Sequence, residues 1–138
     1  MRLWHKDLLS YLPKQQLVSQ WRECCCIAKN ISVSGTPNHI LVNRILEYPE
    51  RHFVCYAGMV CNVMQCRGYN VNTEKFLQHT TYNSVFVGVS DLFANWHDDI
   101  YLRQCLYNLE EKYICNGISK EEWQRIYDRF GDFTPLVK

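Results

Sequence analysis

An arginine and a glutamate stand side by side at Arg22 and Glu23, after a tryptophan and before three consecutive cysteines, in the run WRECCC. Three kinds of site fit these residue types. The charged pair could be the working part of an enzyme, with a carboxylate for proton transfer and a guanidinium for an anion. The thiols could hold a metal or respond to oxidation. The whole run could also be the solvated edge of a helix.

The eight cysteines argue against a metal site. They stand at Cys24, Cys25, Cys26, Cys55, Cys61, Cys66, Cys105 and Cys115. No two of them have the two intervening residues that are typical of zinc ligands. Adjacent residues on a helix point about 100° apart, so three in a row cannot easily bind one ion. We interpret the thiols as reduced and used mainly as small core hydrophobes.

Hydrophobic periodicity predicts an all-α fold. Leu17, Trp21, Cys24 and Ala28 recur at the spacing of an amphipathic helix over 13–29. Further helices are predicted over 38–48, 49–68, 98–114 and 119–130, with a helical turn over 73–79, a loop over 30–38 and an irregular stretch over 80–92. Since helix 49–68 is apolar nearly all round, we expect it at the centre of a single compact domain that covers residues 1–138.

The helical wheel by itself predicts no function for the charged pair. Arg22 lies about 140° from Leu17 and Glu23 about 240° from it. Both positions fall off the apolar stripe, so periodicity alone favours a solvated polar face.

Composition and charge set wider limits. Apolar residues make up 47% and charged residues 21% of the chain, which favours a compact globule over disorder. No run reaches the roughly 18 apolar residues of a membrane span, and the start lacks the features of a signal peptide, so we expect a cytoplasmic protein. The net charge is +1, but residues 1–30 carry five basic and two acidic side chains. This mildly positive end permits contact with DNA without requiring it.

The opening block MRLWHKDLL…LPKQQLVSQWREC resembles the pyrimidine-dimer DNA glycosylase family, of the bacteriophage endonuclease V type. It is most similar to bacterial relatives that open MRLWH and carry QxRECC. The similarity continues through RGYNV (67–71) and resumes at HDDIYLRQCLYNLEEK (97–112). The opening block is the specific part, because the later blocks consist mostly of helix pattern.

The resemblance implies a DNA glycosylase with AP-lyase activity, whose nucleophile is the chain's own α-amine, here that of Met1. Ordinary α-amines have a pKa of about 7.7–8.0, so a good fraction is free base at neutral pH. The amine would attack C1′ of a damaged nucleotide and expel the base, and the resulting imine would allow β-elimination. The family's carboxylate falls on Glu23, which would stabilise the cationic sugar and accept the C2′ proton. Because Arg2 is bulky, we expect Met1 to be retained.

The resemblance also implies contacts with damaged double-stranded DNA, made by a monomer without a cofactor. Arg22 matches a phosphate clamp, Arg2 a second basic contact and Gln15 a polar contact near the lesion. His39 is either a DNA contact or an ordinary surface or capping histidine. Cys26 stands where the phage enzyme has a third arginine, and FGDFTPLVK does not match that enzyme's aromatic, lysine-rich tail.

Two alternatives stay open. One keeps the chemistry and changes the substrate to another damaged base, or to abasic sites only. The other is a non-enzymatic helical module that binds a protein or responds to oxidation through exposed thiols, of which Cys26 is the one on the polar side of its helix.

Overall fold

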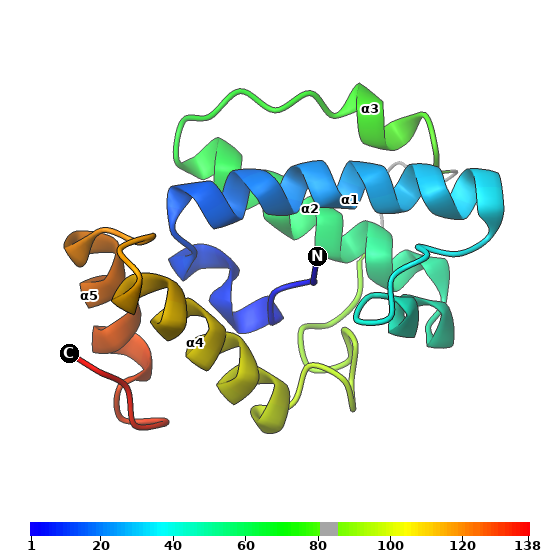
Figure 1. Ribbon diagram of the computed structural model, residues 1–138. Helices are drawn as coiled ribbons and strands as arrows, with labels where there is room; N and C mark the ends of the chain where they lie inside the picture. The colour runs from blue at the N-terminus through cyan, green and yellow to red at the C-terminus, as the bar shows by residue number, and fades with distance from the viewer. Residues whose placement is uncertain (81–85) are drawn as a thin grey trace.

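Helices make up the regular structure of the protein (Figure 1). The computed structural model describes residues 1–80 and 86–138. In chain order these contain the 3₁₀ helix η1 (Lys6–Tyr11), α1 (Lys14–Ser34), the 3₁₀ helix η2 (Asn43–Glu47), α2 (Glu50–Cys66), α3 (Glu74–Leu77), α4 (Asp99–Ile114) and α5 (Lys120–Phe130). Within these residues there is no strand, which confirms the all-α prediction. None of the helices described is long and apolar enough to cross a membrane.

Helix α1 is the longest element and carries the charged pair. Pro13 precedes its first turn, and Gly35 ends it in the left-handed conformation, with φ 75° and its N–H on the Ile31 carbonyl. The predicted apolar stripe is buried, from Leu17 at 0% exposure to Ala28 at 3%. The predicted end at residue 29 is wrong, because Ile31 still packs against the core and the first residue with a positive φ is Gly35.

Helix α2 packs against α1, η1 and η2, so the prediction of a central helix is confirmed. Its buried side chains are His52, Phe53, Val54, Tyr56, Ala57, Val60 and Met64. The glycine stop is also confirmed, since Gly68 has φ 82° and the following N–H bonds back to the Met64 carbonyl.

The segment between α1 and α2 departs from the predicted helix over 38–48. Only Asn43–Glu47 is helical, and it is a 3₁₀ helix. The cause is local, because the Asn43 side chain accepts the His39 N–H at 3.1 Å and so holds a turn in place of a helical start.

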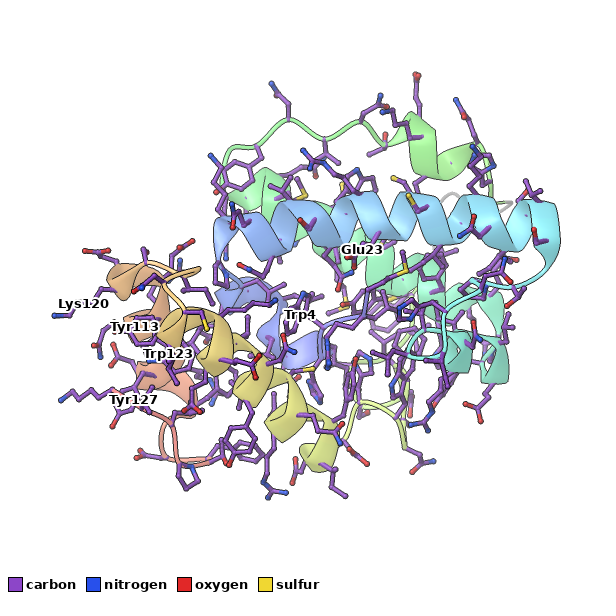
Figure 2. The ribbon with its side chains drawn as sticks, viewed as in Figure 1. Trp4, Glu23, Tyr113, Lys120, Trp123 and Tyr127 are labelled. Atoms are coloured by element: carbon purple, nitrogen blue, oxygen red, sulfur yellow. The ribbon has the colours of Figure 1, made fainter. Side chains whose placement is uncertain are left out.

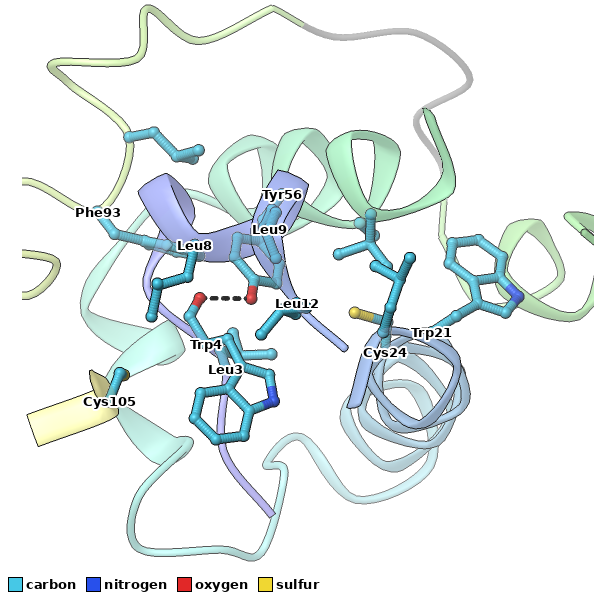
Figure 3. Packing of buried hydrophobic residues seen from close by; sticks show 14 of the residues in the cluster. Leu3, Trp4, Leu8, Leu9, Leu12, Trp21, Cys24, Tyr56, Phe93 and Cys105 are labelled. Atoms are coloured by element: carbon cyan, nitrogen blue, oxygen red, sulfur yellow. Dashed lines mark hydrogen bonds between the residues drawn. The ribbon is translucent and has the colours of Figure 1, made fainter. Parts of the chain in front are cut away.

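The first twelve residues, for which the periodicity predicts no element, supply four leucines to the core. Leu3, Leu8, Leu9 and Leu12 are at most 1% exposed, and Figure 3 shows them packed beside Tyr56 of α2. We call residues 1–5 the N-terminal arm. In Figure 1 this arm lies between the α1–α2 pair and α4.

Helices α4 and α5 complete the fold. Asp98 caps α4, and Ser119 and Glu122 form the predicted capping box of α5. The Trp123 ring stacks on Tyr113, with ring centroids 5.1 Å apart. Of the predicted irregular stretch 80–92, residues 81–85 lie outside the described residues, and 86–92 contain turns only.

Candidate active site

The backbone of the N-terminal arm is held by side chains from other elements. The Tyr56 hydroxyl of α2 donates to the Trp4 carbonyl at 2.6 Å (Figure 3). The Tyr101 hydroxyl of α4 donates to the Leu3 carbonyl. Since extended backbone in a core must satisfy its polar groups, these bonds fix the path of the arm.

Gln20 of α1 is the central anchor of the arm and is fully buried. Its Oε1 accepts the Trp4 N–H at 2.7 Å and lies 3.0 Å from the Tyr56 hydroxyl. Its Nε2 donates to the Arg2 carbonyl at 3.0 Å and to Glu23 Oε2 at 3.1 Å. One amide therefore joins the arm to the Glu23 carboxylate, and both of its N–H groups donate.

Glu23 is half-buried at the point where α1 meets the arm. Burial raises the pKa of its carboxyl group above the ordinary value. The positive charge of the N-terminal amine, the Arg2 backbone N–H, the His39 side chain and the Gln20 amide act against this and lower that pKa. The carboxylate thus lies in a partly desolvated site beside the chain's first nitrogen.

The Met1 amine lies near enough to Glu23 for its charge to lower the pKa of that carboxyl group. Figure 2 shows Glu23 on the side of α1 that faces the arm, close to Trp4. The Met1 residue is 43% exposed. The wheel's interpretation of Glu23 as part of a solvated face is wrong, because the arm covers that side of α1.

A surface cavity of about 910 Å³ opens next to Glu23. Gln15, Arg22 and Glu23 line it from α1, and Trp4 lines it from the arm. The opposite wall comes from the end of α4 and the start of α5, with Lys112, Asn116, Gly117, Ile118, Ser119 and Glu122. Two of the predicted DNA-contacting residues therefore share one hollow with the carboxylate.

Arg2 and His39 lie near the same site with other partners of their own. The Arg2 guanidinium stands 5.6 Å from the centre of the Trp4 ring and donates to Cys105 Sγ at 3.8 Å. The His39 Nδ1 accepts the Leu41 N–H at 3.2 Å, a turn-stabilising bond of the kind expected of a capping histidine. A DNA contact by either residue stays a prediction.

At the end of the arm, His5 stacks on a histidine that precedes α4. His5 and His97 stack with ring centroids 5.2 Å apart, and His97 Nδ1 accepts the Lys6 N–H at 3.0 Å. Burial, aided by the charges of His5 and Lys6, lowers the pKa of His97 to about 2. His97 is therefore neutral at physiological pH. Burial also lowers the pKa of His5, and both rings pack as part of the core.

Sequence reasoning missed the residues that assemble this site, namely Gln20, Tyr56, His97 and Tyr101. Only Gln20 left a usable signal. It stands three residues after Leu17 and one before Trp21, on the apolar stripe of α1. A glutamine on a core-facing stripe indicates a buried hydrogen-bonding role.

The thiols do not gather at this site. Cys26, Cys66 and Cys115 are exposed, Cys24 and Cys105 are buried, and the other three are intermediate. In the described part of the chain, no three histidine, cysteine or acidic residues group in a way that could hold a metal ion. Burial raises the pKa of the Cys24, Cys25, Cys61 and Cys105 thiols, which makes these four poor nucleophiles.

Comparison with known proteins adds one finding. The family model of pyrimidine dimer DNA glycosylases matches residues 1–77, which include the arm, α1 and α2. No curated protein and no solved structure matches the chain.

Proposed function

The chain belongs to the family of pyrimidine dimer DNA glycosylases, and we propose that it excises damaged pyrimidines with the Met1 α-amine as nucleophile and Glu23 as the acid–base residue. The observation that carries this proposal is the Gln20 amide, which bonds both to the arm and to Glu23. A buried amide that bonds both to the arm and to a carboxylate supports this proposal, because covalent catalysis by an amine needs the amine and an acid–base group held close together.

The reaction begins at the neutral amine of Met1. Its lone pair forms a bond to C1′ while the glycosidic bond breaks. The base leaves with the electron pair of the glycosidic bond and takes up a proton. Loss of a proton from nitrogen and opening of the sugar ring give the imine. The Glu23 carboxylate stabilises the positive charge that develops at the sugar.

Strand cleavage follows from the imine. The imine makes the C2′ proton acidic, and Glu23 accepts that proton. The electrons of the C2′–H bond form a double bond to C3′, and the bond from C3′ to the phosphate oxygen breaks. Water then hydrolyses the imine and returns the amine. A partly desolvated carboxyl group suits this role, because its raised pKa makes it a stronger base than an exposed glutamate.

The cavity beside Glu23 suits an extruded nucleotide. Extrusion costs a few kcal/mol and costs least at a damaged base. In this proposal Arg22 clamps a phosphate at the rim, Gln15 makes a polar contact, and Arg2 and His39 add further DNA contacts. Since α4 and α5 supply the opposite wall, we extend the catalytic domain to the whole of residues 1–138, acting as a monomer. The MRLWH and RECC runs favour the bacterial branch of the family.

Borohydride trapping tests the proposal. The protein is incubated with duplex DNA that carries an abasic site or ultraviolet damage, and borohydride is added to reduce any imine. We expect a covalent adduct that disappears when the N-terminus is acetylated or extended by an uncleaved tag. An adduct that survives acetylation would place the nucleophile on a lysine. The absence of any adduct would refute the proposal that the protein is an enzyme of this kind.

A further inference from the structure

Two adjacent apolar side chains, Ile40 and Leu41, project into solvent between α1 and η2. Ile40 is 85% exposed and Leu41 is 50% exposed, whereas Val42 and Ile45 just after them are buried. Single exposed apolar residues are common on protein surfaces. Here two adjacent ones project together from a turn whose next apolar residue, Val42, is buried, so they form a small apolar tip.

The turn that presents this pair is held by its own hydrogen bonds. The Leu41 N–H donates to His39 Nδ1 at 3.2 Å, and the Asn43 N–H donates to the His39 carbonyl at 2.8 Å. The His39 N–H donates to Asn43 Oδ1 at 3.1 Å, and Asn38 adopts a positive φ of 58°. The apolar tip is thus preorganised, which reduces the entropy lost when it binds.

The turn stands beside the candidate active site. The charge of His39 is close enough to lower the pKa of Glu23, as the charge of the N-terminal amine also does. Figures 1 and 3, from two directions, both show the segment after α1 passing the start of the N-terminal arm. A duplex that reaches Met1 and Glu23 would therefore also meet Ile40.

The surrounding sequence suits a polyanion. Residues 24–46 contain no aspartate or glutamate and carry Lys29 and Arg44 in addition to His39. Lys29 and Arg44 are both exposed, and Arg44 also pairs with Glu47 at 3.2 Å. Cationic side chains around an apolar tip match a nucleic acid, which offers phosphates outside and stacked bases inside.

We propose that Ile40 and Leu41 form a wedge that enters the base stack of duplex DNA next to the lesion and holds the unstacked step open while the nucleotide is extruded. The wedge rests on the proposed function, since it serves the same site. Apolar side chains that enter a base step unstack it and kink the duplex. Two side chains are too small a patch for a stable dimer, which needs about 800 Å² from each partner, so DNA is the better occupant.

The test uses the full-length protein and a duplex with a tetrahydrofuran abasic analogue next to 2-aminopurine, whose fluorescence rises when it unstacks. Ile40→Ala should weaken binding to this duplex about tenfold and remove most of the fluorescence rise. Binding to an undamaged duplex should change less than about twofold, because it depends on phosphate contacts. Ile40→Met, which keeps the apolar bulk, should restore both signals, and Val33→Ala, at a residue 74% exposed, should change neither.

Several results would overturn the wedge. The first is an Ile40→Ala variant that binds and unstacks the damaged duplex like the wild type. The second is an Ile40→Ala variant whose affinity falls equally for damaged and undamaged duplexes. The third is a free protein that forms a dimer which Ile40→Ala dissociates. Imine trapping on single-stranded abasic DNA separates the wedge from the enzyme. If Ile40→Ala traps like the wild type there and behaves normally on the duplex, the wedge alone fails. If the wild type traps nothing on any DNA, the proposed function fails.

Discussion

Replacing Gln20 with methionine should loosen the N-terminal arm and disorder the site at the same time. Methionine has a similar volume and no hydrogen-bonding amide, so the core stays filled while the anchor is lost. Two backbone groups lose their partner, the buried Trp4 N–H and the partly buried Arg2 carbonyl. The Glu23 carboxylate loses a donor as well.

The magnitude follows from these groups. Leaving a buried polar group without a partner costs about 1–3 kcal/mol, so the loss at the Trp4 N–H should lower the free energy of unfolding by about 1–3 kcal/mol, and the partly buried Arg2 carbonyl adds less. Urea unfolding followed by tryptophan fluorescence measures this. With a slope of about 1–3 kcal/mol per molar urea, a loss of about 2 kcal/mol should lower the midpoint by about 0.7–2 M. Gln124→Met removes the surface bond from Gln124 to Asp128 and should change the free energy by less than about 0.5 kcal/mol.

The pH profile of imine trapping gives a second measurement, which a loss of stability alone would not change. Without the Gln20 donor the pKa of Glu23 should rise further, since that bond lowers it in the wild type. The acid limb of the pH profile for imine trapping should therefore move to higher pH. A misplaced arm should also slow trapping on the order of 100-fold at the optimum. If Gln20→Met keeps both the urea midpoint and the pH profile of the wild type, the anchoring role is refuted.

Two further predictions follow from charge and burial. Folding raises the pKa of Glu23, so the ionised carboxylate opposes folding at neutral pH. Any stability that the Glu23 side chain contributes is present below about pH 4.3 and is lost as the pH rises through the folded-state pKa. Glu23→Gln should therefore be at least as stable as the wild type at pH 7, and any gain in the free energy of unfolding should shrink toward pH 4. The variant should also lose strand cleavage. Lower stability at pH 7 or retained cleavage would contradict this. His97 has a folded-state pKa lowered to about 2, so the stability it contributes is present above about pH 6.5 and is lost progressively as the pH falls below that value. In His97→Asn the urea midpoint should decrease less between pH 6.5 and pH 4 than in the wild type. An unchanged decrease would show that the His97 ring does not cause the loss of stability in acid.

The sequence predicted the helices well where periodicity and capping decide the outcome. The stripe through Leu17 and Trp21, the capping box of α5 and the glycine stop after α2 follow from residue type and spacing alone. The boundaries that failed depend on tertiary contacts or on a competing side chain. Ile31 extends α1 into the core, and the Asn43 side chain holds a turn where a helix was predicted.

The site was only partly predictable. Residue types and resemblance pointed to Arg22 and Glu23. The wheel placed both on an outer face, which is confirmed for the exposed Arg22 and wrong for Glu23, because the wheel cannot show what packs there. The arm covers Glu23, and its backbone is held by Tyr56 and Tyr101 from helices far away in the chain. Such long-range bonds leave no periodic trace in a single sequence.

The most direct measurement is the position of the trapped adduct on the chain. After borohydride reduction on abasic duplex DNA, the protein is digested and the modified peptide is sequenced by mass spectrometry. We expect the modification on the Met1 α-nitrogen. Lys14 and Lys112, which line the cavity, are the amines that would otherwise carry it, and a modification on either would contradict the role of Met1 as nucleophile.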